Sequence, residues 1–281
     1  MKKLLLGLTL LLTSTSFAQQ IGNSDFEAWG AVSGGSEPTN WNSFLTAQGG
    51  WAWAAANQMQ QSADVRPGSI GTSSCRINSR LAFTIIANGN VTLGRINMGS
   101  TTPTDASNYN ISLTTDANYS EALTSRPDSL VFWAKYIPGA GSITDEARMK
   151  ATLHGNYNYR DPEDANSTAQ VVATAIRNYT TTNNQWVRFS VPFVYTGNGI
   201  NPAYILVTFA TNKTPGGGHQ SDVVFIDDVE LKYNQPLVAN NDSYSGDENT
   251  DIICNVLSND TDPENSINNT TVTIVTQPTN G

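Results

Sequence analysis

The sequence predicts an all-β protein built as an antiparallel sandwich or barrel. Short runs alternate apolar and polar residues, as strands with one buried face do. Turn residues break these runs, since the chain has 22 Gly and 12 Pro among its 281 residues. No long stretch repeats apolar residues at helical spacing, so we expect little helix. The predicted strands include 81–86, 129–136, 148–154, 169–176, 186–193 and 204–210.

Residues 1–18 predict a secretion signal. Two lysines near the start are followed by an apolar core over 4–12, and small residues lead to a cleavage point after Ala18. The apolar core is too short to cross a bilayer, so we expect no membrane insertion. The mature chain is therefore expected to begin at Gln19 and to be secreted or displayed on the cell surface.

The composition is acidic and lacks common catalytic motifs. The formal net charge is −9, and removal of the signal leaves 13 basic against 24 acidic residues, or −11. Such a charge argues against nucleic acid as a partner. Cys75 and Cys254 fall in separate predicted domains, so we expect no disulfide framework. With two histidines and no HExxH or CxxC motif, a His-based zinc site is not expected either.

The closing strand of the main domain is predicted at 221–233, with the sequence SDVVFIDDVELKY. Its alternation points Phe225, Val229 and Leu231 to one face and places Asp227 on that same apolar face. A buried carboxylate costs several kcal/mol unless it is paired, hydrogen-bonded or bound to a metal. This carboxylate therefore needs a partner.

The two ends of 21–233 carry a resemblance. NSDFE at 23–27 and IDDVEL at 226–231 resemble the first and last strands of a jelly-roll β-sandwich of the carbohydrate-binding-module type. The resemblance implies that these strands lie side by side and that a structural calcium sits near them. Glu27 and Asp227 would supply its charged ligands, with carbonyl oxygens completing the shell. The alternative is an Asp227 hydrogen-bonded to backbone amides.

Further motifs point to a family. DFEAW near the N-terminus, PTNWNS at 38–43, RPDSLVFWAKY at 126–136 and VPFVY at 191–195 follow one another between those ends. Together they are similar to the carbohydrate-metabolism domain (PCMD) of Bacteroidetes. The resemblance implies a jelly roll over 21–233 on a secreted protein. The carbohydrate role of that family rests on its fold, so the resemblance implies no particular reaction.

After a predicted linker at 234–237 the composition changes. The segment 238–281 resembles the start of bacterial Ig-like or cadherin-like repeats, through NDSY, GDENT, ICNVLSNDTDPE and VTIVTQPTNG. An Ig-type sandwich needs about 100 residues, so we expect an incomplete Ig-like domain here. Further domains of the same longer chain are then expected as its neighbours.

A binding strip is predicted on the strand 129–136. If Phe132 and Tyr136 face the core, Trp133 and Lys135 face outward or into a cleft. Aromatic rings beside cationic groups suit a polyhydroxylated or uronic ligand. A second aromatic strip, Trp51 and Trp53 in GGWAWAAAN, is predicted on one strand face.

Three further residues are predicted to extend that site. His154 lies on a second polar strip, and Tyr157 and Tyr159 follow in a loop that could cap one end of a groove. A lone His on a strand equally suits a structural role. We therefore assign glycan contacts to Trp133 and Lys135, together with His154, Tyr157 and Tyr159.

No catalytic residue is assigned. Asp228 and Glu230 share a strand face at roughly 7 Å, a spacing that glycosidases use. A catalytic strand of this kind carries three acids at alternating positions, whereas Ile226 and Lys232 occupy the neighbouring positions here. We therefore expect Asp228 and Glu230 to lie on a solvent-exposed face of the strand. The predicted function is a non-catalytic glycan-binding or adhesive module whose partner is a polysaccharide or glycan. The alternatives are a jelly-roll glycan-active hydrolase or lyase, or a purely structural surface domain.

Overall fold

A computed structural model describes residues 18–141, 143–234, 238–245, 247, 251 and 253–261. The chain divides into two compact units, Met1–Lys232 and Tyr233–Gly281. The predicted signal lies almost wholly outside the described residues, as does much of the predicted Ig-like segment. In the second unit, Val238 and Thr261 form an antiparallel bridge. No helix among the described residues is long and apolar enough to cross a membrane.

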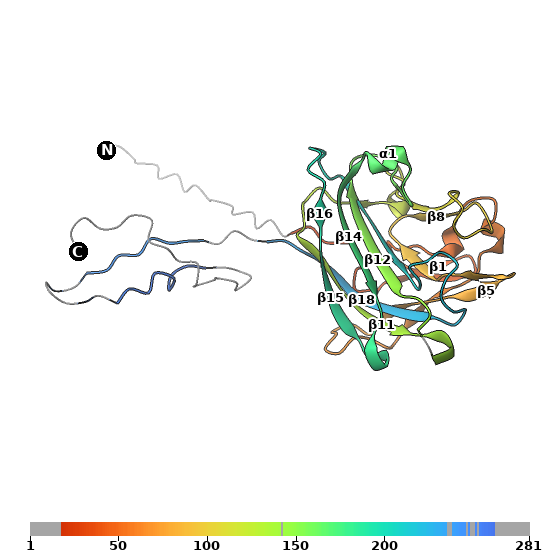
Figure 1. Cartoon of the computed structure of the whole chain (residues 1–281), viewed down its shortest axis with the longest axis horizontal. Helices are drawn as coiled ribbons and strands as arrows, with labels where there is room; N and C mark the ends of the chain where they lie inside the picture. Colours follow the sequence, from red (N-terminus) through yellow and green to blue (C-terminus); the bar gives the residue numbers. More distant parts are fainter. Residues whose placement is uncertain are drawn as a thin grey trace, which may run out of the picture. The chain divides into compact units, whose positions relative to one another are not determined.

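The first unit is built on two antiparallel sheets (Figure 1). The six-stranded sheet, called sheet 1 below, contains β10 (Glu121–Ala122), β17 (Tyr204–Ala210), β12 (Ala147–His154), β14 (Val171–Tyr179) and β16 (Val194–Tyr195) in that order, with β7 (Asn90–Thr92) also paired to β17. The five-stranded sheet, called sheet 2, has the order β15 (Val187–Pro192), β11 (Ser129–Ile137), β18 (Val223–Lys232), β4 (Ser74–Asn78) and β3 (Met59–Ser62).

Smaller elements surround the sheets. Two hairpins are β1 (Trp29–Val32) with β2 (Gly35–Pro38), and β5 (Arg80–Ala82) with β6 (Ile85–Ala87). A three-stranded sheet has the order β13 (Arg160–Asp161), β9 (Asn108–Ile111) and β8 (Arg95–Met98). Helical turns are short: α1 (Ala165–Thr168), η1 (Phe44–Thr46), η2 (Ala52–Ala54), η3 (Ala117–Tyr119), η4 (Gly139–Gly141) and η5 (Thr182–Asn184). The all-β prediction is confirmed.

The strand connections make the fold a jelly roll. Its eight main strands are, in chain order, β4, β7, β11, β12, β14, β15, β17 and β18. In sheet 2 the first strand lies beside the eighth, the eighth beside the third, and the third beside the sixth. In sheet 1 the second strand (β7) lies beside the seventh (β17), the seventh beside the fourth (β12), and the fourth beside the fifth (β14). This interleaving is that of two Greek keys wrapped into a sandwich, as predicted.

The core lies between the two sheets and follows the predicted alternation of β11. Phe132, Ala134 and Tyr136 are fully buried. The ring of Phe132 lies 5.1 Å from that of Phe189 in sheet 2 and 5.2 Å from that of Phe209 in sheet 1. Aromatic contacts across the layers therefore hold the two sheets together.

The two ends of the jelly roll meet, as the sequence predicts. The Ser24 carbonyl accepts a hydrogen bond from the Val229 amide at 2.8 Å. The Gln20 side chain both donates to the Leu231 carbonyl and accepts from the Leu231 amide, each at 2.8 Å. The opening segment is thereby held along β18 without forming a regular strand of its own.

A β-bulge in β18 corrects the predicted orientation of Asp227. The register against β11 shifts between the pairs Glu230–Val131 and Asp227–Trp133. Asp228 sits at the shift with φ of 44°, in the left-handed region. Because one extra residue reverses the faces, Asp227 lies on the outer side of sheet 2 with Trp133, and not on the core face. It is nonetheless fully buried.

Candidate functional site

The predicted strip on β11 points away from the core but is covered. The Arg66 guanidinium lies 5.4 Å from the ring centroid of Trp133. Lys135 is 8% exposed, forms an ion pair with Asp64, and lies 4.5 Å from the ring centroid of Phe225. The Asp64 carboxylate and the rings of Trp186 and Phe225 surround the Lys135 ammonium group, and the glycan contact stays a prediction.

His154, Tyr157 and Tyr159 lie away from that strip. Trp133 and Lys135 lie on β11 of sheet 2, whereas His154 lies on β12 of sheet 1 with Tyr159 stacked on it, so the structure does not bring these residues into one strip. His154 and Tyr159 are fully buried and stack at 4.9 Å between ring centroids, whereas Tyr157 is half-buried. The structure supports the structural alternative for His154.

The partners of His154 explain its burial. One ring nitrogen lies 2.9 Å from the Gly155 carbonyl and the other 3.0 Å from the Ser112 hydroxyl. Burial lowers the pKa of His154 to about 4, because the charged imidazolium loses its hydration there. Tyr159 donates its one hydroxyl proton to Glu163 at 2.5 Å, and its oxygen lies 3.2 Å from the Thr152 hydroxyl, which can donate to it. These side chains satisfy one another inside the fold.

The two carboxylates predicted to hold calcium have hydrogen-bond partners. Glu27 accepts from the Thr72 amide at 2.9 Å, from the Ser73 amide at 2.7 Å and from the Thr72 hydroxyl at 3.1 Å. Asp227 accepts from the Arg66 amide at 3.1 Å and the Asp228 amide at 2.9 Å. Both therefore fit the alternative of a carboxylate held by backbone amides.

The described residues do not by themselves fit a calcium ion. N–H donors face both carboxylates, whereas a calcium shell needs oxygens. Within the described part of the chain, no group of three or more His, Cys, Asp or Glu could hold a metal. We therefore expect the melting temperature to be the same in calcium and in a chelator. A rise with calcium that Asp227→Asn abolishes would establish the metal site instead.

The acidic pair on β18 shows no catalytic arrangement. Asp228 forms an ion pair with Arg66, and the exposed Glu230 forms one with Lys232. Glycoside hydrolysis needs one carboxyl group that is protonated near neutral pH and a second that is ionised. Each of these carboxylates is instead paired with its own cation, and the described residues include no second acid arranged opposite either one.

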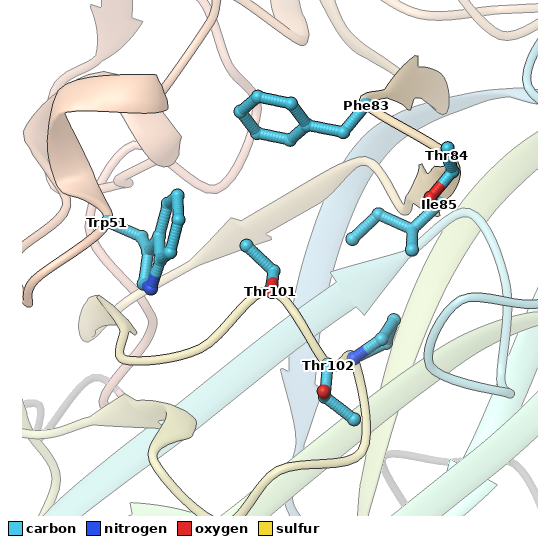
Figure 2. Close-up of a pocket in the computed structure, with 7 residues that line it drawn as sticks. Trp51, Phe83, Thr84, Ile85, Thr101 and Thr102 are labelled. Carbon is cyan, nitrogen blue, oxygen red and sulfur yellow. The ribbon is translucent and has the colours of Figure 1, made fainter.

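The structure places a pocket elsewhere, among three loops (Figure 2). Its volume is about 510 Å³, within the range of small-molecule sites. The aromatic part of its wall is Trp51 and Phe83, whose ring centroids are 6.2 Å apart in an edge-to-face arrangement. The residues that line the pocket are Trp51, Phe83, Thr84, Ile85, Thr101, Thr102 and Pro103.

The first loop carries the two tryptophans on a helical turn. The prediction that Trp51 and Trp53 share one strand face is wrong, because Trp51 precedes η2 and Trp53 lies within it. The Trp51 amide donates to the Met98 carbonyl at 2.9 Å. Gly49 makes this approach possible, since its φ is 102° and a Cβ there would lie 2.5 Å from the Met98 oxygen. The tryptophan loop is thus fixed to the end of β8.

The second loop presents Phe83 at the tip of the β5–β6 hairpin. Ala82 pairs with Ile85, which leaves Phe83 and Thr84 as the two turn residues. Phe83 has φ of 55°, a conformation that favours Gly or Asn and costs an aromatic residue roughly 1–2 kcal/mol. Its side chain is nevertheless 66% exposed. Apart from its edge-to-face contact with Trp51, turn preference gives no reason for a phenylalanine here, and such strain often marks functional positions.

The third loop follows β8 and carries the threonines. Asn108 holds it, because its Oδ1 accepts from the amides of Gly99 and Ser100, each at 3.0 Å. Its Nδ2 donates to the carbonyls of Ser100 at 3.1 Å and Thr102 at 2.8 Å. Four hydrogen bonds from one side chain therefore fix the position of Thr101 and Thr102 beside the pocket.

Arg80 joins the hairpin to the tryptophan loop. From β5 its Nη2 donates to the Ala54 carbonyl at 2.9 Å, at the end of η2, and its Nε donates to Gln58 at 3.3 Å. Gln58 in turn donates to the carbonyls of Asn78 and Ala87 at 2.9 and 3.0 Å. The loops are therefore held in place before any ligand arrives, which lowers the entropy cost of binding.

The pocket opens onto an aromatic surface. Trp53 is 74% exposed, and its ring centroid lies 5.6 Å from that of Trp51. Figure 2 shows the Trp51 ring, the Phe83 ring and the Ile85 and Thr101 side chains around one hollow. No described residue accepts a hydrogen bond from Trp51 Nε1. The site thus combines apolar ring faces, an indole donor and threonine hydroxyls, which can contact a ligand with apolar and hydroxyl-bearing faces.

The comparisons with known proteins support the fold. No protein-family model and no curated protein matches the chain. A Bacteroides thetaiotaomicron protein, provisionally named a glycoside hydrolase, shares the fold with a TM-score of 0.53 and 18% identity, over 70% of this chain and 63% of that one. This chain thus covers less than two thirds of that protein.

Two further structures are more distant. A Bacteroides vulgatus protein with the same provisional name has a TM-score of 0.49 and 16% identity, over 73% of this chain and 89% of that one. A carbohydrate-binding module specific for non-crystalline cellulose has a TM-score of 0.33 and 10% identity, over 69% and 87%. At these values the first similarity shows a shared fold, and the other two carry no functional argument.

Proposed function

We propose that the jelly-roll unit is a non-catalytic glycan-binding module of an exported protein, with the three-loop pocket as its binding site. The observation that carries the proposal is the cluster of Trp51, Trp53 and Phe83. Two of these rings are mostly exposed, and Phe83 is held in a strained conformation. Sugars present C–H faces that stack on aromatic rings, and their hydroxyls pair with donors such as an indole N–H. The predicted secretion signal supports export.

The enzyme alternative stays second. The similar Bacteroides protein is provisionally named a glycoside hydrolase, but a shared fold does not transfer a reaction. The seven residues that line the pocket include no carboxylate. A glycoside hydrolase needs two acids at the bond that it cleaves, so this pocket supports binding without cleavage.

A glycan array tests the proposal. The exported chain is applied to a polysaccharide array, and the release of reducing sugar is measured on every glycan that binds. We expect binding without release. Release from a bound glycan, abolished by substitution of an acidic residue, would favour the enzyme, and a chain that binds no glycan would leave the structural alternative.

Phe83→Asn is expected to weaken glycan binding severalfold while leaving the free energy of unfolding within about 1 kcal/mol of the wild type. Asn adopts the left-handed conformation at low cost, and this gain offsets the loss of the contact with Trp51. The matched control is Leu81→Ala, which removes an exposed apolar side chain of the same hairpin that does not line the pocket. Unchanged binding by Phe83→Asn would remove the hairpin tip from the site.

A further inference from the structure

We infer that this pocket selects uncharged polysaccharide chains and rejects uronic or sulfated ones, an inference that rests on the proposed glycan-binding function. It differs from the expectation from the sequence, in which aromatic rings beside cationic groups suit a polyhydroxylated or uronic ligand. Lys135 and His154 are buried elsewhere in the fold. The ligand class must instead follow from the groups around Trp51 and Phe83.

The pocket offers no charge to an anionic ligand. All seven residues that line it are uncharged. A carboxylate or sulfate that leaves water loses hydration free energy, and the attraction of a nearby cation is what best offsets that loss. Arg80, the cation of the hairpin, already donates to the Ala54 carbonyl and to Gln58. The whole chain has a net charge of −9, which adds a general repulsion of anionic polymers.

The polar groups of the pocket match neutral hydroxyls. Trp51 Nε1 is a donor without a described acceptor, and Thr84, Thr101 and Thr102 carry hydroxyls that can both donate and accept. A sugar hydroxyl can likewise both donate and accept, so each contact can be satisfied in either direction. A sulfate oxygen or carboxylate only accepts, so these hydroxyls could meet it only as donors, and no cation lines the pocket to offset its charge.

The exposed rings favour a polymer over a single sugar. Trp51 contacts both Trp53 and Phe83, so no gap between the rings could enclose a sugar. A sugar unit that stacks on the exposed Trp53 ring beside the pocket therefore keeps its other side in water. Enclosed sites bury most of a small ligand, whereas a one-sided contact buries little of each unit. Useful affinity then requires several sugar units along Trp53 and the pocket.

A matched series of polymers tests the inference. Neutral glucans, mannans and galactans are compared with the same polymers after oxidation of C6 to a carboxylate, by isothermal titration with the full exported chain. We expect oxidation to weaken binding at least about tenfold, which corresponds to about 1.4 kcal/mol. Binding to the neutral polymers should persist in about 1 M NaCl, where charges are screened beyond about 3 Å. Oligosaccharides of the same series should bind more tightly as their length increases.

The outcomes separate the two proposals. Trp53→Ala, at an exposed position, and Trp51→Ala are tested beside Leu81→Ala as the control. If oxidised polymers bind as well as neutral ones and both tryptophan variants weaken that binding, the glycan site stands but its selectivity for uncharged chains is wrong. If a single sugar binds as tightly as an oligosaccharide, the preference for polymers is wrong. If neither variant alters binding to any polymer, or if the aromatic surface binds only proteins or lipid vesicles, the proposed function itself fails.

Discussion

Trp51→Ala is expected to reduce the affinity for a bound glycan by about 10- to 100-fold while the domain remains folded. Burial of a large side chain against a ligand contributes roughly 1.5–3 kcal/mol, and each 1.4 kcal/mol is tenfold in affinity. Trp51 is the central ring of the cluster, so its loss removes one contact surface and the support of two others. Isothermal titration measures the affinity, and thermal unfolding checks the fold.

Trp51→Phe distinguishes the contribution of the aromatic ring to affinity from that of the indole N–H donor. The variant keeps an aromatic face beside Phe83 but cannot donate to a sugar hydroxyl. We expect an affinity between those of the wild type and Trp51→Ala, with the difference from wild type close to one hydrogen bond, about 1 kcal/mol. Equal affinity of Trp51→Phe and wild type would show that the indole nitrogen does not contact the ligand. Wild-type affinity in Trp51→Ala would contradict the site as a whole.

The second large effect is an acid-dependent loss of stability at His154. Its pKa is about 4 in the fold against an ordinary value of 6.5. The unfolded chain therefore takes up a proton at a higher pH than the folded one. The stabilisation from the neutral, buried imidazole is fully present above pH 6.5 and is lost as the pH falls to about 4. The difference corresponds to about 3 kcal/mol.

The titration of Asp227 has the opposite effect on folding stability over part of this pH range. Burial, with the nearby charge of Asp228, raises the pKa of Asp227 to about 6. Its contribution to stability is present below pH 4 and is lost as the pH rises through 6. The two effects partly cancel in the wild-type protein. A measurement must therefore compare variants with wild type, and not read the wild-type profile alone.

Urea unfolding between pH 4 and 7.5 makes that comparison. His154→Phe keeps a ring beside Tyr159 and Tyr204 but cannot be protonated. The unfolding free energy of this variant, relative to wild type, should rise by up to about 3 kcal/mol as the pH falls from 7 to 4. The control is His219→Gln, at the only other histidine of the chain. A constant difference across the range would show that His154 titrates normally and is accessible.

The layers of the fold could be predicted from sequence because they follow from alternation. The alternation of period two in β11 places Phe132, Ala134 and Tyr136 in the core. The resemblance of segments 23–27 and 226–231 to the first and last strands of a jelly roll predicts that these two segments are in contact. The same rule fails in β18, where the bulge at Asp228 adds one residue and exchanges the faces for Asp227. Nothing local distinguishes that aspartate from its neighbour. Register depends on the partner strand, which the sequence does not identify.

The candidate site was harder to predict for two physical reasons. The run 81–86 is apolar and has no Gly, Asn or Pro, so it predicts one strand, whereas the chain turns at Phe83 against the usual turn preference. The partner of Lys135 is Asp64, 71 positions earlier in the chain, and only the fold brings the two together. The glycines before Trp51 were the one local signal, since GG predicts a turn more strongly than a strand.

The meeting of the chain ends at β18 also bears on how such a unit can be used in larger proteins. Gln20 is bonded to Leu231, so the entry and the exit of the jelly roll are neighbours. A domain with adjacent ends can be inserted into a surface loop of another protein, or repeated in tandem, without separation of its sheets. The same adjacency should permit circular permutation, with the old ends joined by a short linker and new ends opened at an exposed turn. The aromatic loops are anchored to β8 and to the β5–β6 hairpin, so they would keep their arrangement in either context.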